Sequence, residues 1–331
     1  MTIMTTVTLN DIRVARERIA GKIERTPTGL SHSLSERLGV PVHLKLEHRQ
    51  TTGSFKLRGA SNAVASLSAE EKARGVVAAS TGNHGRALAH AAKLEGMRAV
   101  ICMSRLVPGN KLDEIRRLGA DVRIIGNSQD EAQQEVERLV AQEGLVMLPP
   151  FDHPAIIAGQ GTLGLEVIEQ VPDAALVLVQ LSGGGLASGI AAAVKAVSPG
   201  TKIIGVSMAR GAAMKASLDA GRPVEVEELP TLADSLGGGI GLGNRLTFAM
   251  CRDLLDDVIL LSEDEIAAGI RHAYEQEREI VEGAGAVGIA ALLVGKVRAT
   301  GPVVVLLSGR NIDMNTHRKI VCGDALAERA A

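Results

Sequence analysis

Aromatic residues are almost absent from this sequence. Its 331 residues include no Trp, one Tyr and three Phe. Proteins that bind single-stranded nucleic acid stack bases on aromatic rings, so we do not expect that function. The formal net charge of -2 gives no basic excess for a duplex or an anionic membrane. The core must be aliphatic, which is feasible because hydrophobic residues make up 46% of the chain.

Cysteine is equally scarce. Cys102, Cys251 and Cys322 are odd in number, far apart and without a CxxC pair. Neither a disulfide framework nor a zinc site is therefore expected. Residues 1–16 lack the apolar core of a signal peptide, and the uncharged stretch 174–194 is interrupted by glycines. We expect a cytoplasmic protein that does not cross a membrane.

Apolar, β-like runs alternate with helical patterns along the chain. This alternation predicts parallel βαβ units, and hence an α/β fold whose parallel-type sheets are flanked by helices. The expected strands are residues 42–46, 75–79, 99–103, 121–125, 175–181, 202–206 and 302–307. The expected helices include residues 85–95, 111–118, 129–143, 186–197 and 263–282.

A Pro-rich turn at residues 149–154 separates two groups of these units. Such turns are typical places for a chain to cross between domains. The pattern predicts a smaller domain over residues 53–155, and a larger domain that combines residues 1–52 with residues 156–331.

Two short segments far apart in the sequence could carry chemistry. Residues 53–60, GSFKLRGA, place Lys56 beside small and aromatic neighbours, and residues 182–186, SGGGL, join an expected strand to an expected helix. Free N–H groups at a helix N-terminus bind anions, although a triple glycine can also serve only as a tight turn. An amine and an anion-binding loop are what pyridoxal 5'-phosphate requires, for its aldehyde and its phosphate.

A third segment, STGNHG at residues 80–85, follows the strand expected at residues 75–79. Its hydroxyl, amide and N–H groups would suit a substrate carboxylate. A purely structural role, with Ser80 or Thr81 as a helix N-cap and Asn83 in a turn, explains the same residues equally well.

Two other functions compete with this interpretation. An NADP-dependent oxidoreductase could bind a pyrophosphate at residues 182–186 and a 2'-phosphate at Arg210. That fold expects G-x-G-x-x-G at the loop, whereas residues 183–188 read GGGLAS, and an acidic residue after the next strand, whereas residues 205–208 read GVSM. A non-catalytic binding protein would need the pocket but would have no need of Lys56.

With LSGRN at residues 307–311 and AGQGT at residues 158–162, these segments resemble the fold-type II pyridoxal-phosphate enzymes of the threonine/serine dehydratase family. The resemblance covers essentially the whole chain in the same order, and it implies a two-domain, tryptophan synthase beta-like fold. Residues 46–53, LEHRQTTG, and residues 232–239, LADSLGGG, look most like the hydroxyectoine-utilisation dehydratase branch.

The resemblance also implies roles for individual residues. Lys56 would form the Schiff base with the cofactor and then act as the general base, with Ser80 and Thr81 also in catalytic positions. The residues around the cofactor would be Phe55, Asn83 at the ring hydroxyl, Ser308 at the pyridine nitrogen, Glu282 nearby, and Gly183, Gly184, Gly185 and Leu186 at the phosphate. The substrate carboxylate would be bound by Ser80, Thr81, Gly82, Asn83 and His84.

The activity implied is that of a dehydratase, or ammonia-lyase, which eliminates a β-hydroxyl from a small hydroxy amino acid. Threonine, serine, 3-hydroxyaspartate and a hydroxyectoine-derived compound all remain open as substrates. A 3-hydroxyaspartate dehydratase and a serine racemase are alternatives within the family. The resemblance further suggests a homodimer.

The sequence departs from the family pattern at several positions. Serine racemases carry a serine where this chain has Thr81, which argues against racemisation. Many relatives bind a cation through carboxylates just after the strand matching residues 202–206, and residues 207–212 contain none. We therefore expect no metal there. Arg310 and Ser235 replace glycines of the family, with consequences for the substrate pocket that the sequence leaves open.

Overall fold

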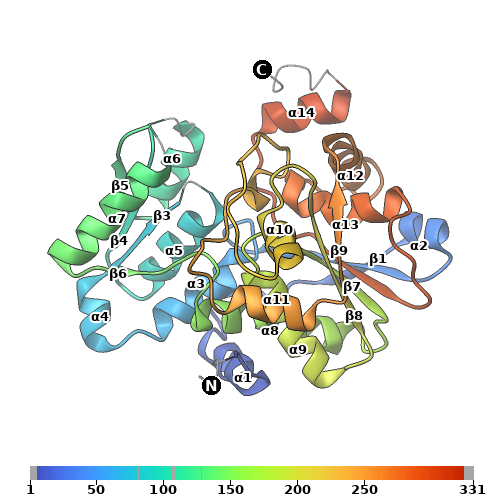
Figure 1. Ribbon diagram of the computed structural model, residues 1–331, viewed down its shortest axis with the longest axis horizontal. Helices are drawn as coiled ribbons and strands as arrows, with labels where there is room; N and C mark the ends of the chain where they lie inside the picture. The colour runs from blue at the N-terminus through green and yellow to red at the C-terminus, as the bar shows by residue number, and fades with distance from the viewer. Residues whose placement is uncertain (1–5, 81, 106–108, 128, 324–331) are drawn as a thin grey trace.

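Two β-sheets organise the protein (Figure 1). The computed structural model describes residues 6–80, 82–105, 109–127 and 129–323. One sheet has six strands in the order β1-β2-β10-β7-β8-β9, and the other has four in the order β5-β4-β3-β6. The strands are β1 (Thr28–Ser31), β2 (Val42–Lys45), β3 (Val76–Ala79), β4 (Ala99–Met103), β5 (Asp121–Ile124), β6 (Val146–Met147), β7 (Leu176–Gln180), β8 (Lys202–Met208), β9 (Asp257–Leu261) and β10 (Val303–Leu306).

Helices flank both sheets, and each sheet with its helices forms one lobe in Figure 1. The strands pair in parallel except for β1 with β2. The α-helices are α1 (Leu9–Arg18), α2 (His32–Leu38), α3 (Lys56–Ala65), α4 (Ala69–Arg74), α5 (Asn83–Leu94), α6 (Gly109–Arg117), α7 (Gln129–Glu143), α8 (Pro154–Gln170), α9 (Gly185–Val197), α10 (Ala213–Ala220), α11 (Thr247–Leu254), α12 (Glu263–Glu275), α13 (Gly283–Leu293) and α14 (Met314–Cys322). Two 3₁₀ turns, η1 (Glu47–Arg49) and η2 (Asp234–Leu236), complete the list.

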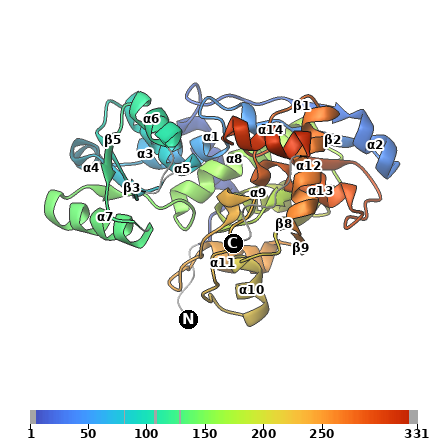
Figure 2. The same ribbon diagram turned by 90° about the horizontal axis from the view of Figure 1, so that it is seen from above.

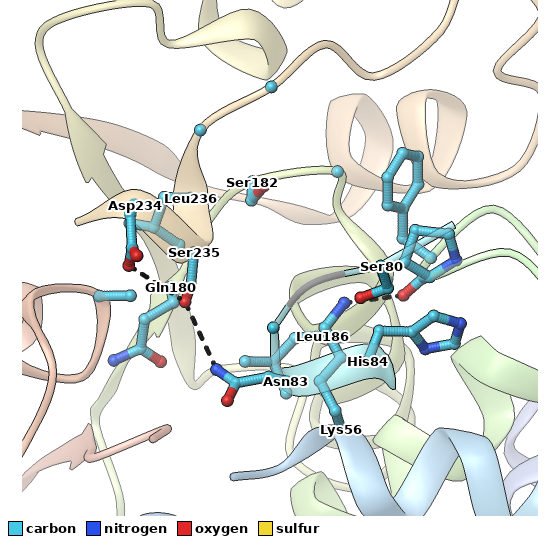
Figure 3. A pocket seen from close by; sticks show the side chains of 18 of the residues that line it. Lys56, Ser80, Asn83, His84, Gln180, Ser182, Leu186, Asp234, Ser235 and Leu236 are labelled. Atoms are coloured by element: carbon cyan, nitrogen blue, oxygen red, sulfur yellow. Dashed lines mark hydrogen bonds between the residues drawn. The ribbon is translucent and has the colours of Figure 1, made fainter. Parts of the chain in front are cut away.

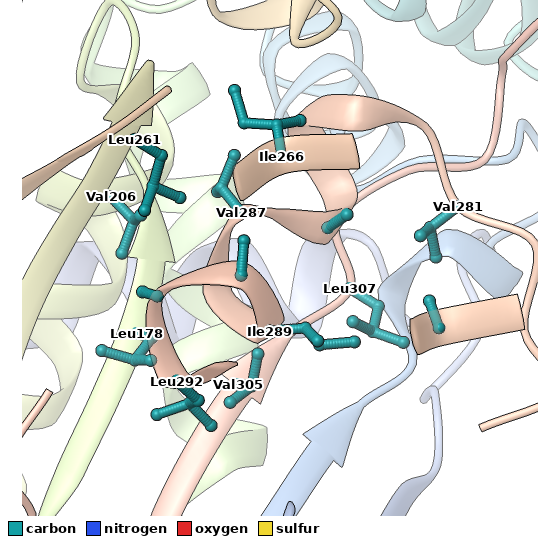
Figure 4. Packing of buried hydrophobic residues seen from close by; sticks show 14 of the residues in the cluster. Leu178, Val206, Leu261, Ile266, Val281, Val287, Ile289, Leu292, Val305 and Leu307 are labelled. Atoms are coloured by element: carbon teal, nitrogen blue, oxygen red, sulfur yellow. The ribbon is translucent and has the colours of Figure 1, made fainter. Parts of the chain in front are cut away.

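The six-stranded sheet is buried on both faces because its strands alternate their side chains between two cores. Leu176 and Leu178 of β7 pack with α12 and α13 (Figure 4). Val177 and Val179 of the same strand pack on the other face with α8 and α9. An apolar strand of this kind cannot lie at a solvent-exposed edge, which explains why β7 occupies an inner position.

The four-stranded sheet is built in the same way. Ile101 of β4 packs with α3 and α5, whereas Val100 and Cys102 face α7. The view from above shows α7 and α5 on opposite sides of these strands (Figure 2). In the part of the chain that the structure describes, no helix is both long enough and apolar enough to cross a membrane.

The structure confirms the expected strands and corrects one helix. β2, β3, β4, β5, β7, β8 and β10 lie at the seven expected runs. The helix expected over residues 263–282 ends at Glu275, and a new helix begins at Gly283. Between them, Arg278 has a φ of 60°, which a continuous right-handed helix excludes. The predicted domain limits stay a prediction, although β3 to β6 all lie within residues 53–155.

A buried ion cluster joins α3 to β2, η1 and α8. Arg58 Nε donates to Glu47 Oε1 at 2.6 Å, and its NH1 donates to Glu166 Oε1 at 2.7 Å. Lys45 Nζ donates to Glu166 Oε2 at 2.6 Å. Arg58, Glu47 and Lys45 have no exposed surface, and Glu166 is 6% exposed. Two cations therefore balance two carboxylates inside the protein, which is the condition for burying them.

Removing one member should destabilise the fold strongly. Arg58→Met leaves Glu47 and Glu166 buried without their main partner, so we expect the free energy of unfolding to fall by about 3–5 kcal/mol in a denaturant titration. The matched control is Arg16→Met, since Arg16 pairs with Glu169 at the surface, where the side chains are 48% and 45% exposed. That change should cost less than about 1 kcal/mol. Equal losses in the two variants would contradict this account of the cluster.

Candidate functional site

A cavity of about 490 Å³ lies where loops of the two sheets meet, a size suited to a small molecule (Figure 3). Ser80 follows β3 of the smaller sheet, while Ser182 and Ser308 follow β7 and β10 of the larger one, and all three line the cavity. The carboxyl ends of parallel strands are the usual ligand sites of such sheets. The fold thus brings together segments that are far apart in the sequence.

Lys56 enters this cavity from the first position of α3. Its Nζ donates to the backbone oxygen of Pro150 at 2.8 Å and lies 5.4 Å from the ring centre of Phe55. Burial lowers the pKa of the Lys56 amine to about 8, because the charged form loses its hydration. About a tenth of this amine is therefore unprotonated, and so nucleophilic and basic, at pH 7, far more than for an ordinary lysine with a pKa of 10.5.

The glycine loop presents backbone N–H groups to the same cavity. Gly184 has a φ of 88° and directly precedes α9, whose N-terminus has no side-chain cap. The first N–H groups of a helix have no partner within it, and the helix dipole adds positive potential. Residues 182–186 contain no cationic side chain. The loop can therefore hold an anion by its backbone alone.

The segment after β3 combines structural and cavity-lining roles. Ser80 Oγ accepts a hydrogen bond from Gly85 N at 3.0 Å, which supports the start of α5. His84 Nε2 lies 2.9 Å from the carbonyl oxygen of Leu148, so this nitrogen must donate. Burial, assisted by the charge of Lys56, lowers the pKa of His84 to about 4. His84 is consequently neutral at physiological pH. Thr81 lies outside the described residues.

Asn83 and Glu282 form a pair in the wall of the cavity. Asn83 Nδ2 donates to Glu282 Oε1 at 2.8 Å. Glu282 Oε2 accepts from the backbone N of Asn311 at 2.9 Å. Burial, with a further contribution from the charge of Asp234, raises the pKa of the Glu282 carboxyl to about 7, despite these hydrogen bonds. Glu282 is therefore poised between its neutral and charged forms.

The cavity collects every described residue that the sequence assigned to the site. These are Phe55, Lys56, Ser80, Gly82, Asn83, His84, Gly183, Gly184, Gly185, Leu186, Glu282 and Ser308. Ser235 also lines the cavity, whereas Arg310 is exposed and is not among the lining residues. In the described part of the chain, no group of three or more His, Cys, Asp or Glu is arranged to hold a metal ion.

Sequence reasoning missed several residues that the fold adds to the wall. Gln180 Nε2 donates to the backbone oxygen of Leu306 at 2.7 Å, and its buried Oε1 has no hydrogen-bond partner among the described residues. Phe151 packs so closely on the glycine loop that a Cβ at Gly183 would overlap its ring. Gln180 could have been found from its position just before the glycine loop. No local feature of the sequence indicated that Phe151 lies at the cavity.

The lowered pKa of Lys56 can be measured directly on the ligand-free protein. We expect its reaction with an amine-selective acylating reagent, followed by mass spectrometry, to rise with pH to a midpoint near 8, because only the unprotonated amine reacts. The peptide that contains Lys56 is identified by its disappearance in Lys56→Ala. A midpoint at the ordinary value of 10.5 would show that burial does not act on this amine.

Comparison with known proteins yields consistent matches. Residues 19–309 match the family model described as pyridoxal-phosphate dependent enzyme. A Sinorhizobium fredii protein named "Putative threonine dehydratase" is 66% identical over 321 residues, covering 97% of each chain. An L-threonine ammonia-lyase of Thermotoga maritima is 43% identical, over 95% of this chain and 78% of that protein. The structure of maize serine racemase superposes with a TM-score of 0.91 at 33% identity, over 96% of this chain and 98% of that one.

Proposed function

The chain belongs to the family of pyridoxal-phosphate-dependent enzymes, and on that premise we propose that it eliminates the β-hydroxyl group of threonine or serine to give a 2-oxo acid and ammonia. The predicted fold class, the predicted cofactor and the predicted class of enzyme, a pyridoxal-phosphate-dependent lyase, are confirmed by the family and its threonine ammonia-lyase members. The observation that carries the proposal is the convergence of the Lys56 amine and the glycine loop on one cavity.

The residues of the cavity fit this cofactor. Pyridoxal phosphate supplies an aldehyde that an amine can attack and a ring that withdraws electrons from the substrate Cα. Lys56 offers the amine. The uncapped N-terminus of α9 offers N–H groups for a phosphate dianion, and the cradle has no room for a side chain at Gly183. Asn83 offers an amide for the ring hydroxyl, and Ser308 a hydroxyl for the pyridine nitrogen.

Each residue then has a definite task in the elimination. The segment from Ser80 to His84 binds the substrate carboxylate, with the place of Thr81 taken from the family resemblance. Lys56, unprotonated in part because of its lowered pKa, takes the Cα proton as general base. The β-hydroxyl would then leave as water with the proton that Lys56 removed, which returns the amine to its starting state. The enamine released from the site tautomerises, and water hydrolyses it to the 2-oxo acid and ammonia.

Ser308 influences which reaction follows. A neutral hydroxyl stabilises a protonated pyridine nitrogen less than a carboxylate would, so negative charge spreads less fully into the ring. Elimination would then be favoured over transamination. Racemisation, the function named for the maize protein, is argued against by Thr81, which stands where serine racemases carry a serine.

The exact substrate, the assembly and the cellular location of the protein stay predictions. A hydroxyectoine-derived substrate, suggested by residues 46–53 and 232–239, is one of them, and 3-hydroxyaspartate is another. Assembly as a homodimer and a cytoplasmic location are also still to be tested. The family match itself argues against the NADP-dependent oxidoreductase, because it covers the glycine loop and Lys56 together.

The decisive experiment offers the holoenzyme L-threonine, L-serine, 3-hydroxyaspartate and hydroxyectoine, and follows 2-oxo acid and ammonia. We expect equal amounts of both products from threonine or serine. Lys56→Ala should lose at least about 10³-fold in turnover, since it removes both the attachment point and the base. The exposed Lys202 provides the control, and Lys202→Ala should retain full activity.

Two results would contradict this function. One is racemisation of serine by the holoenzyme faster than its elimination. The other comes from borohydride reduction followed by peptide mapping, where a pyridoxyl label on a lysine other than Lys56 would exclude the proposed attachment.

A second prediction concerns the phosphate. Gly184→Asp places a side chain where φ is 88° and a carboxylate beside the proposed phosphate site. We expect the dissociation constant of pyridoxal phosphate to rise by about 10- to 100-fold, as measured by absorbance titration. Gly200→Asp is the control, because Gly200 is exposed, and a Cβ there meets nothing within 4 Å. An unchanged affinity in Gly184→Asp would move the phosphate to another place.

A further inference from the structure

A chain of hydrogen bonds leads from Arg86 to the cavity through two asparagine amides. Arg86 NH1 donates to Asn311 Oδ1 at 3.1 Å. Asn311 Nδ2 donates to the backbone oxygen of Thr52 at 2.9 Å and to Asn83 Oδ1 at 2.6 Å. Asn83 Nδ2 then donates to Glu282 Oε1 at 2.8 Å. Asn83 and Glu282 line the cavity, whereas Arg86 and Asn311 are not among its lining residues.

Only one orientation of the Asn311 amide satisfies its neighbours. A guanidinium can only donate, and the Thr52 carbonyl can only accept. The oxygen of Asn311 must therefore face Arg86, and its nitrogen must face Thr52 and Asn83. Because that nitrogen donates, the atom of Asn83 nearest to it has to be the oxygen. The nitrogen of Asn83 is then left for Glu282 and Ser235, as Figure 3 shows for Ser235.

Gly53 leaves room for the Asn311 side chain because it has no side chain of its own. A Cβ at Gly53 would overlap Asn311 Oδ1, and Gly53 has a φ of 78°. The backbone N of Arg310 donates to the oxygen of Gly53 at 2.9 Å. The backbone before Lys56 therefore packs against the Asn311 amide, and the hydrogen bond from Arg310 to Gly53 keeps the two segments together.

We propose that Asn311 is a positioning residue that fixes the amide of Asn83 with its N–H side, and not its oxygen, toward the cofactor, whose ring hydroxyl would take the N–H that lies 3.4 Å from Ser235 Oγ. The inference rests on the proposed function, in which Asn83 meets the ring hydroxyl. A donor at that place stabilises the ionised hydroxyl, whereas an acceptor would stabilise the protonated one. Asn311 would thereby set the charge state of the ring hydroxyl without touching it, and Arg86 would set the orientation of Asn311.

The test is an isosteric change, Asn311→Asp. The new carboxylate has no donor for Asn83, so Asn83 should turn its nitrogen toward residue 311 and its oxygen toward the cavity. The ionised ring hydroxyl gives bound pyridoxal phosphate its visible absorbance, and the protonated form absorbs in the near ultraviolet. We expect the ratio of visible to near-ultraviolet absorbance to fall about tenfold, as for the loss of one hydrogen bond to a charged group.

Two further variants separate orientation from simple charge. Asn315→Asp adds the same charge at an exposed position in the first turn of α14, and its spectrum should match wild type. In an Asn83→Ala background, Asn311→Asp should change the ratio by less than about twofold, because no amide remains to be turned. A full tenfold fall in that background, or a wild-type spectrum for Asn311→Asp, would overturn the inference.

Two further experiments distinguish a failure to fold, and a failure of the proposed function, from a failure of the inference about Asn311. If Asn311→Asp fails to fold or to bind cofactor, Asn311→Ala tests the same point without adding a charge, because it removes the donor that orients the oxygen of Asn83. It should lower the absorbance ratio in the same direction, and an unchanged ratio would overturn the inference. A wild-type enzyme that binds pyridoxal phosphate but releases no 2-oxo acid would contradict the proposed elimination, whereas an unchanged Asn311→Asp spectrum in an active enzyme contradicts only the role of Asn311.

Discussion

The pairing of Arg58 with two carboxylates fixes the place of α3, and with it the place of the Lys56 amine. Lys56 begins this helix two residues before Arg58, whose guanidinium is fully buried between Glu47 and Glu166. A side chain with five donors in a fixed plane orients a helix more sharply than apolar contact can. The backbones of α3 and α8 also meet closely, since a Cβ at Gly159 would lie 2.6 Å from the oxygen of Arg58.

The loop between α12 and α13 depends on a second set of carboxylates. Glu277 accepts hydrogen bonds from Ser31 and Ser33 at 2.6 and 2.7 Å. Glu279 Oε2 lies 2.7 Å from His48 Nε2, and Glu282 reaches the cavity. Glu277, Glu279 and Glu282, which all fall within the one long helix expected over residues 263–282, instead attach this loop to three different parts of the protein. Their attachments explain why α12 stops at Glu275.

The sequence predicted those parts of the site that are local in the chain. A strand followed by Ser182 and three glycines already defines an anion-binding turn, and alternating apolar runs located seven of the strands. Contacts between distant residues could not be read in this way. Asn311 and Asn83 are 228 positions apart, and Arg58 and Glu166 are 108 apart. The lowered pKa of Lys56 likewise comes from burial, which belongs to the folded protein and not to its local sequence.

The electrostatics of the cavity follow from the same burial. The pKa of Glu282 is raised to about 7 and that of Lys56 is lowered to about 8, so neither group carries a firmly fixed charge near neutral pH. The α9 N-terminus and the amide of Asn83, by contrast, are dipoles whose direction does not change with pH. A cavity of this kind can hold an anionic ligand through fixed dipoles while its titratable amine exchanges a proton. That division of tasks is what proton abstraction from an amino acid requires.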